Sequence, residues 1–213
     1  VGNYFVTARV IADAVDAGVY DNYRLSFEKV GISIVKRNIE VALKTDYVYG
    51  DEFDDSYSLT DNQMAFNDSL ELTFDTEYSA GKPVGNYSVN IAAKVNGSES
   101  TDNYTISLSN GTITVSPRSV TLTLTSTARM VVGEAWTGEI TAADNLFQGD
   151  SVSAKIGLSV DAAGTYSYSA EEEGWTVETA FHNANGEDVT ANYAADYAVT
   201  VTILSVTIEH TLK

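Results

Sequence analysis

The chain has no cysteine, two prolines and two histidines among its 213 residues. Without cysteine there is no disulfide framework, thiol nucleophile or thiolate metal site. His182 and His210 are too few for a typical histidine-rich metal centre, and no phosphate loop, Gly-x-Ser-x-Gly elbow or His-Glu-x-x-His motif occurs. A glycosidase uses a pair of carboxylates, and the chain has many carboxylates, but no sequence motif identifies a catalytic pair. The sequence therefore predicts a protein that is not an enzyme.

Basic residues are also scarce. Twelve lysines and arginines stand against 30 aspartates and glutamates, which gives a formal net charge of −18. This charge repels phosphate backbones and anionic lipids, so we expect no nucleic-acid partner. No apolar stretch approaches the roughly 18 residues that a membrane crossing requires, so we expect no membrane insertion by this fragment.

Apolar and polar residues alternate along much of the chain, which is the period of a strand with one buried face. The clearest alternating segments are NIEVAL, SLELTF, YSVNIAA, TISL, TITV, VTLTLT and YAVTVTI. Asn-Gly pairs at 96–97, 110–111 and 185–186 supply turns between them. The nearest helix candidates, residues 9–17 and 171–175, are short and fit a strand end and a loop equally well. We therefore expect an all-β fold.

A pattern of about 80 residues recurs along the chain, which is typical of tandem modules. Asp21-Asn22-Tyr23 returns as Asp102-Asn103-Tyr104, and in both copies the Tyr stands 14 residues before an Arg (37 − 23 and 118 − 104). We expect Ala195-Asp196-Tyr197 to be the third copy.

A second landmark has the same period. Val1-Gly2-Asn3-Tyr4 returns as Val84-Gly85-Asn86-Tyr87 and, more loosely, as Ala163-Gly164-Thr165-Tyr166. A third landmark is the pair Asn67-Asp68, which returns as Gly149-Asp150. An aromatic side chain at a strand entrance usually closes the end of a sandwich, with its hydroxyl bonded to the backbone. We expect this role for the repeated tyrosines.

The phase of the repeat divides the chain after each Arg. Residues 1–37 are then the C-terminal half of one module, residues 38–118 a complete module, and residues 119–213 a divergent one. A half module would expose unpaired strand edges and an apolar face, so we expect further modules upstream or completion by a neighbouring chain. We expect tandem Ig-like β-sandwich modules with nearly continuous backbone across each Arg, and a β-grasp-like module is the alternative fold.

The landmarks of residues 38–118 resemble a known family. They are Lys44, Tyr49-Gly50-Asp51, Asn67-Asp68-Ser69-Leu70, Val84-Gly85-Asn86-Tyr87, Asp102-Asn103-Tyr104-Thr105-Ile106 and Gly111-Thr112-Ile113-Thr114-Val115. In this combination the chain resembles the MBG-type, or YGX-type, tandem repeat domains of large bacterial cell-surface and adhesin proteins. The third module departs from the pattern, with Val132-Gly133-Glu134 in place of Tyr-Gly-Asp.

The resemblance implies an extracellular module on the bacterial cell surface, with adjacent repeat modules as its partners and no catalytic residues to carry over. Short joints at residues 36–37 and 117–118 leave few free dihedral angles. We therefore expect a semi-rigid stalk or spacer in cell adhesion. The alternative is an adhesin module that binds a surface glycan or a host protein at Trp136 and Trp175 or at an exposed strand edge.

Two groups of residues are candidate binding sites. Asp51, Glu52, Asp54 and Asp55 offer the hard oxygen ligands that calcium prefers, although a solvated, self-repelling loop is the favoured explanation of their clustering. Trp175 follows three glutamates, and together with Trp136 it could form an aromatic platform for sugar rings. The alternative is that both tryptophans cover the edge of an apolar core. We expect no cofactor, and this calcium ion is the single candidate.

Overall fold

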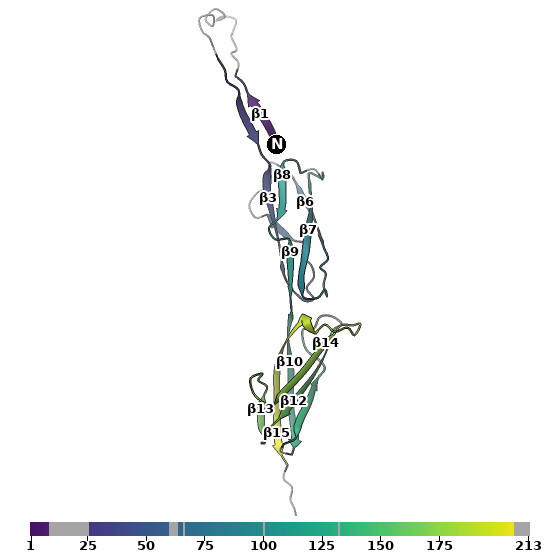
Figure 1. The fold of residues 1–213 in the computed structure, drawn as a ribbon. Coiled ribbons are helices and arrows are strands. Elements are labelled where there is room, and N and C mark those ends of the chain that lie inside the picture. The colour runs from purple at the N-terminus through teal and green to yellow at the C-terminus, as the bar shows by residue number, and fades with distance from the viewer. Residues whose placement is uncertain (9–25, 60–63, 66, 100, 132, 207–213) are drawn as a thin grey trace, which may run out of the picture. The chain divides into compact units, whose positions relative to one another are not determined.

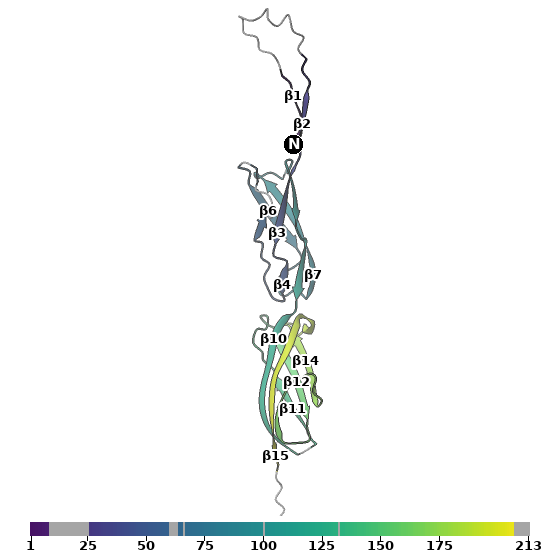
Figure 2. The same cartoon turned by 90° about the vertical axis from the view of Figure 1, so that its left-hand side faces the viewer.

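The computed structural model describes residues 1–8, 26–59, 64–65, 67–99, 101–131 and 133–206, and its ribbon is drawn in Figures 1 and 2. In chain order the elements are β1 (Gly2–Val6), β2 (Val30–Ile34), β3 (Arg37–Leu43), β4 (Asp46–Val48), β5 (Tyr57–Leu59), β6 (Leu70–Thr76), β7 (Gly85–Val95), β8 (Tyr104–Leu108), β9 (Thr112–Ser116), β10 (Arg118–Met130), β11 (Ala135–Ile140), β12 (Ser151–Ser159), β13 (Gly164–Ser167), β14 (Trp175–His182), the 3-10 turn η2 (Thr190–Asn192) and β15 (Tyr193–Ser205). The described part of the chain is therefore all-β, as the sequence predicts. It contains no helix with the length and apolar character that a membrane crossing needs.

Six of the seven alternating segments lie wholly in strands, and SLELTF lies in β6 except for its first residue, Ser69. Strand β12 shows the reason, because Val152, Ala154 and Ile156 are buried while Ser153 and Lys155 between them are exposed. Of the two helix candidates, residues 171–174 form a turn before β14, and residues 9–17 lie outside the described residues. A β-grasp module needs a helix across its sheet, and the described residues supply none.

The chain divides into two compact units. The first comprises residues 1–43, 56–75 and 90–110. Its central strand β3 pairs antiparallel with β5 and parallel with β8. Ile39 and Val41 on β3 are fully buried, and the apolar side chains of β6 and β7 pack against them and Tyr104. Strands β1 and β2 form a separate antiparallel pair in which Gly2 lies opposite Ile34.

The second unit comprises residues 44–55, 76–89 and 111–213. Two three-stranded sheets, in the orders β10-β15-β13 and β11-β12-β14, lie in separate layers (Figure 2). Side chains meet between the layers, since Phe181 stacks on Tyr193 at 4.3 Å and the hydroxyls of Thr179 and Tyr197 are 2.8 Å apart. In the same unit β9 pairs parallel with β4 and antiparallel with β7.

Both repeated arginines open a strand. Only Pro117 separates β9 from β10, and only Val35 and Lys36 separate β2 from β3, as expected from the short joints. Arg37 lies opposite Tyr104 in the parallel pair β3-β8, and Arg118 lies opposite Tyr193 in the parallel pair β10-β15. The compact units cut across residues 38–118, so the module boundaries at 37 and 118 stay predictions.

This register corrects one expectation. The residue that matches Tyr104 in the third copy is Tyr193, whereas the sequence pattern favoured Tyr197, four residues later. Tyr193 follows Asn192 as Tyr104 follows Asn103, so the letters that the copies share are Asn-Tyr. The first copy of this landmark, Asp21-Asn22-Tyr23, lies outside the described residues.

Candidate functional site

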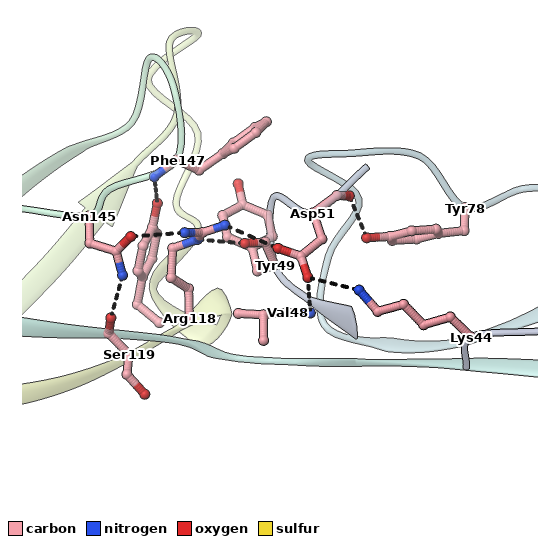
Figure 3. Close-up of polar contacts among 10 residues, drawn as sticks. Lys44, Val48, Tyr49, Asp51, Tyr78, Arg118, Ser119, Asn145 and Phe147 are labelled. Atoms are coloured by element: carbon pink, nitrogen blue, oxygen red, sulfur yellow. Dashed lines mark hydrogen bonds and ion pairs between the residues drawn. The ribbon is translucent and has the colours of Figure 1, made fainter. Parts of the chain in front are cut away.

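The loop after β4 carries Tyr49-Gly50-Asp51, and the side chain of Arg118 lies against it (Figure 3). The Arg118 Nε donates to the Tyr49 carbonyl oxygen at 2.6 Å, and Nη1 donates to Asn145 Oδ1 at 3.1 Å. Nη2 is 3.5 Å from Asp51 Oδ1. A guanidinium presents five donors in a fixed plane, so a single side chain can hold several groups in one geometry. Arg118 thus ties two loops, 49–51 and 145–150, to the start of β10.

Asp51 holds the loop in shape. Its Oδ2 accepts a hydrogen bond from the Val48 amide at 3.1 Å and lies 3.8 Å from Lys44 Nζ. Its carbonyl oxygen accepts from the Tyr78 hydroxyl at 2.7 Å. The side chains of Asp51 and Arg118 are 34% and 18% exposed, so their ion pair contributes only about 0–1 kcal/mol. Its main effect is orientation of the loop.

Two tyrosine hydroxyls share one carboxylate. Tyr49 and Tyr193 donate to Asp150 Oδ2 at 3.1 and 2.6 Å, and the Tyr193 oxygen accepts from the Phe147 amide at 3.0 Å. Both rings are buried. Burial and the bond to Asp150 raise the pKa of Tyr49 to about 12, and the same two causes raise the pKa of Tyr193. Both phenols therefore stay protonated as donors well above neutral pH.

Gly50 permits the close approach of Phe147. Gly50 has a φ of 89°, and a Cβ built on it would lie 2.5 Å from Phe147 Cδ2. The Phe147 ring meets the Tyr49 ring edge to face, with centroids 5.4 Å apart. A side chain at position 50 would displace this ring, so the glycine is needed for both its backbone angle and its missing Cβ. We refer to Tyr49, Gly50, Asp51, Arg118, Phe147, Asp150 and Tyr193 together as the Arg118 joint.

Part of this arrangement occurs again in the first unit. There the Tyr104 hydroxyl donates to Asp68 Oδ2 and accepts from the Ala65 amide at 3.0 Å. Hydrogen bonds from Tyr104 and Asn96 hold the pKa of Asp68 below its usual value. Ala65 and Asp68 precede Phe147 and Asp150 by the same 82 residues (147 − 65 and 150 − 68). The Asn67-Asp68 landmark of the sequence is thus the acceptor of a repeated Tyr-Asp contact.

Two of the three tyrosines of the Val-Gly-Asn-Tyr landmark, Tyr87 and Tyr166, bond the backbone as expected, whereas Tyr4 is 51% exposed. The Tyr87 hydroxyl donates to the Pro83 carbonyl at 2.6 Å, and the Tyr166 hydroxyl donates to the Ala162 carbonyl at 2.9 Å. In both cases the acceptor lies four residues before the tyrosine. These two hydroxyls therefore serve local structure.

The structure does not gather the predicted calcium ligands. The Asp51 carboxylate faces Arg118 and Lys44, and the Asp54 backbone amide donates to the Tyr47 hydroxyl at 3.2 Å. Among the described residues, no group of three or more acidic or histidine side chains is placed to hold a metal ion. Glu52 and Asp55 complete the predicted set and form no such group with the other two. The acidic loop instead contributes Asp51 to the Arg118 joint.

Trp136 and Trp175 lie on the inner face of their sheet. Both are aligned with Leu158, Trp136 from β11 and Trp175 from β14, and aligned residues of antiparallel neighbours share a face. Leu158 is 1% exposed and Trp136 is 8% exposed. Trp175 meets the ring of Tyr168 edge to face at 5.6 Å. This placement favours the core interpretation of the two tryptophans, and binding of a glycan there stays a prediction.

Sequence reasoning named Tyr49-Gly50-Asp51, Arg118 and Asp150 as landmarks of the repeat but assigned them no contacts with one another. It missed Phe147 and Tyr193. One signal was available, because the Asn-Tyr pair at 192–193 repeats the pair at 103–104. Phe147 has no such signal, since Ala65 stands at the matching position.

The raised pKa values predict that the second unit loses stability in alkali. Tyr49 and Tyr78 have pKa values of about 12, in both cases mainly because of burial, whereas an unperturbed tyrosine titrates at about 10. Between about pH 10 and 12 the unfolded chain releases these protons while the folded chain keeps them, so the free energy of unfolding falls as pH rises. Below about pH 10 the two tyrosines contribute no slope.

Urea unfolding at a series of pH values, together with ultraviolet titration of tyrosinate, measures this effect. The Tyr49→Phe and Tyr78→Phe variants should each show a shallower alkaline decline than the parent protein. Titration of every tyrosine near pH 10 in the folded protein would contradict the prediction.

No family model, curated protein or solved structure matches the chain. The proposed function therefore depends on the residues and contacts described above.

Proposed function

We propose that this chain is a non-catalytic extracellular part of a bacterial surface protein, built from tandem Ig-like β-sandwich modules that act as a semi-rigid stalk or spacer in cell adhesion. The resemblance to MBG-type repeats supports the location and the modular plan. The Arg118 joint is the observation that carries the mechanical part of the proposal.

A spacer must resist bending where its modules meet. If the third module is counted from Arg118, the first residue of β10, the loop 49–51 belongs to the module before it. The contacts of Arg118 with Tyr49 and Asp51, and of Tyr49 with Asp150, then span the boundary. Pro117 fixes its own φ between β9 and β10. A backbone connection alone would still pivot, but side contacts at separate points prevent this.

Those contacts lie on more than one element. Arg118 binds the Tyr49 carbonyl, Tyr49 binds Asp150, and the Val84 amide donates to Asn192 Oδ1 at 2.9 Å. Hydrogen bonds to charged groups contribute about 1.5–3 kcal/mol each when both partners are ordered. Residues 44–55, 76–89 and 111–213 belong to one compact unit, in agreement with a joint that packs as a body.

The glycan-binding alternative gains no such support. It needs aromatic rings that are presented to solvent, and Trp136 is buried on the inner face of the β11-β12-β14 sheet.

The stiffness of the joint can be measured with spin labels. The chain has no cysteine, so Ser88→Cys on β7 and Glu139→Cys on β11 introduce two unique labelling sites at exposed strand positions of the second unit. Pulsed electron resonance should give a narrow distribution of label distances. Arg118→Ala should broaden it, because the Tyr49 carbonyl, Asn145 and Asp51 lose their common donor.

Arg129→Ala is the matched control, since Arg129 is an exposed arginine on the same strand β10. It should leave the distribution unchanged. A broad distribution in the doubly labelled parent protein would overturn the stalk proposal, because the joint would then bend freely with all its contacts available.

A further inference from the structure

We propose that the surface of the first unit around Asp68 and Tyr104 receives the Tyr-Gly-Asp loop of another repeat module, supplied by a second copy of residues 38–83 joined ahead of Val1. The inference rests on the proposed function, because it treats the repeats as successive modules. The surface around Asp68 and Tyr104 is not part of the Arg118 joint.

The receiving side of the Arg118 joint has a counterpart for each main contact in the first unit. Arg37 opens β3 opposite Tyr104, as Arg118 opens β10 opposite Tyr193. Asp68 accepts from Tyr104 as Asp150 accepts from Tyr193. In the second unit this surface is occupied, because Tyr49 also donates to Asp150 and its carbonyl accepts from Arg118.

A second contact of the second unit also has a counterpart in the first unit. Asn192 Oδ1 accepts from the Val84 amide at 2.9 Å, and Asn103 Oδ1 accepts from the Val1 amino group at 3.1 Å. Val84 and Val1 hold the same place in the two copies of Val-Gly-Asn-Tyr. The β1-β2 pair is therefore attached at Asn103 as the β7-β9 pair is attached at Asn192.

The surface has room for the loop. A hollow of about 380 Å³ is lined by Arg37, Asp68, Asn103 and Tyr104, with Val1, Ile34, Val35 and Ala65 completing its wall. Arg37 is exposed, whereas Arg118 beneath the loop 49–51 is half-buried. Ala65 is smaller than Phe147, which occupies the matching position of the second unit. The hollow thus offers the charged and polar partners that the Tyr-Gly-Asp loop uses at the Arg118 joint.

The exposed apolar side chains of β1 and β2 indicate that the docking segment also contains strands. Gly2 and Tyr4 face Ile34 and Ile32 in the register that Gly85 and Tyr87 keep with Val115 and Ile113. Ile113 and Val115 are 1% and 2% exposed, whereas Ile32 and Ile34 are 46% and 50% exposed.

Residues 38–83 supply a strand that pairs with β9. Strand β4 lies beside β9, with Tyr47 opposite Val115, and the loop 49–51 follows β4 directly. One segment therefore provides two strands of the sheet that contains β9, namely β4 and β6, together with the Tyr-Gly-Asp loop. A copy of that segment ahead of Val1 would supply strands for β1 and β2 and a Tyr-Gly-Asp loop for the hollow.

The test places a copy of residues 38–83 directly before Val1 of the full chain, which reproduces the natural junction of Pro83 with Val84. Amide hydrogen exchange of β1 and β2 should slow by about tenfold or more, as burial and new hydrogen bonds predict. Asp68→Ala in this protein, and Tyr49→Phe in the added copy, should then show coupled losses of stability in a double-mutant cycle. The coupling should have the sign and size of the coupling between the resident Tyr49 and Asp150.

The outcomes separate the two proposals. Slower exchange without coupling between the added tyrosine and Asp68 overturns the docking of the loop. Unchanged exchange of β1 and β2 overturns the whole inference. The inference is also overturned if residues 38–83 with Tyr49→Phe, added as a separate polypeptide, protect β1 and β2 as well as the joined segment does. A narrow spin-label distribution at the resident joint, measured in the same protein, would in each of these cases leave the stalk proposal intact.

Discussion

Gly50→Ala is expected to lower the free energy of unfolding of the second unit by about 2–5 kcal/mol. Its φ of 89° is a conformation that costs an L-residue about 1–2 kcal/mol. The added methyl group would also lie 2.5 Å from Phe147 Cδ2 and 3.0 Å from Arg118 Nη2, and such overpacking costs about 1–3 kcal/mol. Both tryptophans belong to the second unit, so denaturation followed by tryptophan fluorescence reports on this unit directly.

Gly133→Ala separates the two causes. Gly133 has a φ of 91°, but a methyl group added there would have no neighbour within 4 Å, so this variant should lose only the backbone contribution of about 1–2 kcal/mol. Phe147→Ala should remove most of the additional loss from the Gly50→Ala variant. Equal losses for Gly50→Ala and Gly133→Ala would show that Phe147 does not press on the loop.

Asp150→Ala is expected to cost about 3–6 kcal/mol in the second unit. The substitution removes the acceptor of two buried hydroxyls, those of Tyr49 and Tyr193, and each hydrogen bond to a charged group contributes about 1.5–3 kcal/mol. Urea unfolding detected by tryptophan fluorescence measures the loss, with the midpoint compared at constant slope.

A second background tests whether the hydroxyls cause the loss. With both Tyr49→Phe and Tyr193→Phe in place, Asp150 has no phenol to accept from, and Asp150→Ala should then cost far less than in the parent protein. An undiminished cost in this background would assign the stability of Asp150 to other contacts and remove the Tyr-Asp pair from the joint.

The strands could be predicted from the sequence because alternation follows directly from the geometry of a half-buried strand. Val152, Ala154 and Ile156 are spaced two apart, and each is buried. Their partners could not be predicted, since alternation assigns a residue to a face but not to a neighbour. The parallel pairing of β10 with β15 joins Arg118 to Tyr193, 75 residues later (193 − 118), and no local pattern specifies a contact at that distance.

The same distinction holds at the Arg118 joint. Recurrence at a fixed period identified Tyr49-Gly50-Asp51 and Asp150 as features to explain. The recurrence could not show that Tyr49 binds Asp150, because the period places each landmark along the chain, whereas the contact depends on how the two loops fold. The acidic loop illustrates the difference: four carboxylates in five positions favoured a cation, whereas the structure turns Asp51 toward an arginine and a lysine.

The parallel register of β10 and β15 has a mechanical consequence. Aligned pairs run from Arg118 with Tyr193 to Met130 with Ser205, so the chain enters β10 at one end of the ladder and leaves β15 at the other. Tension applied to these two points would load the ladder in shear, and its hydrogen bonds would have to rupture together rather than one after another. If the chain is the stalk that we propose, a pulling force along it would meet this ladder, formed by the longest strands that the structure describes, in its most resistant direction.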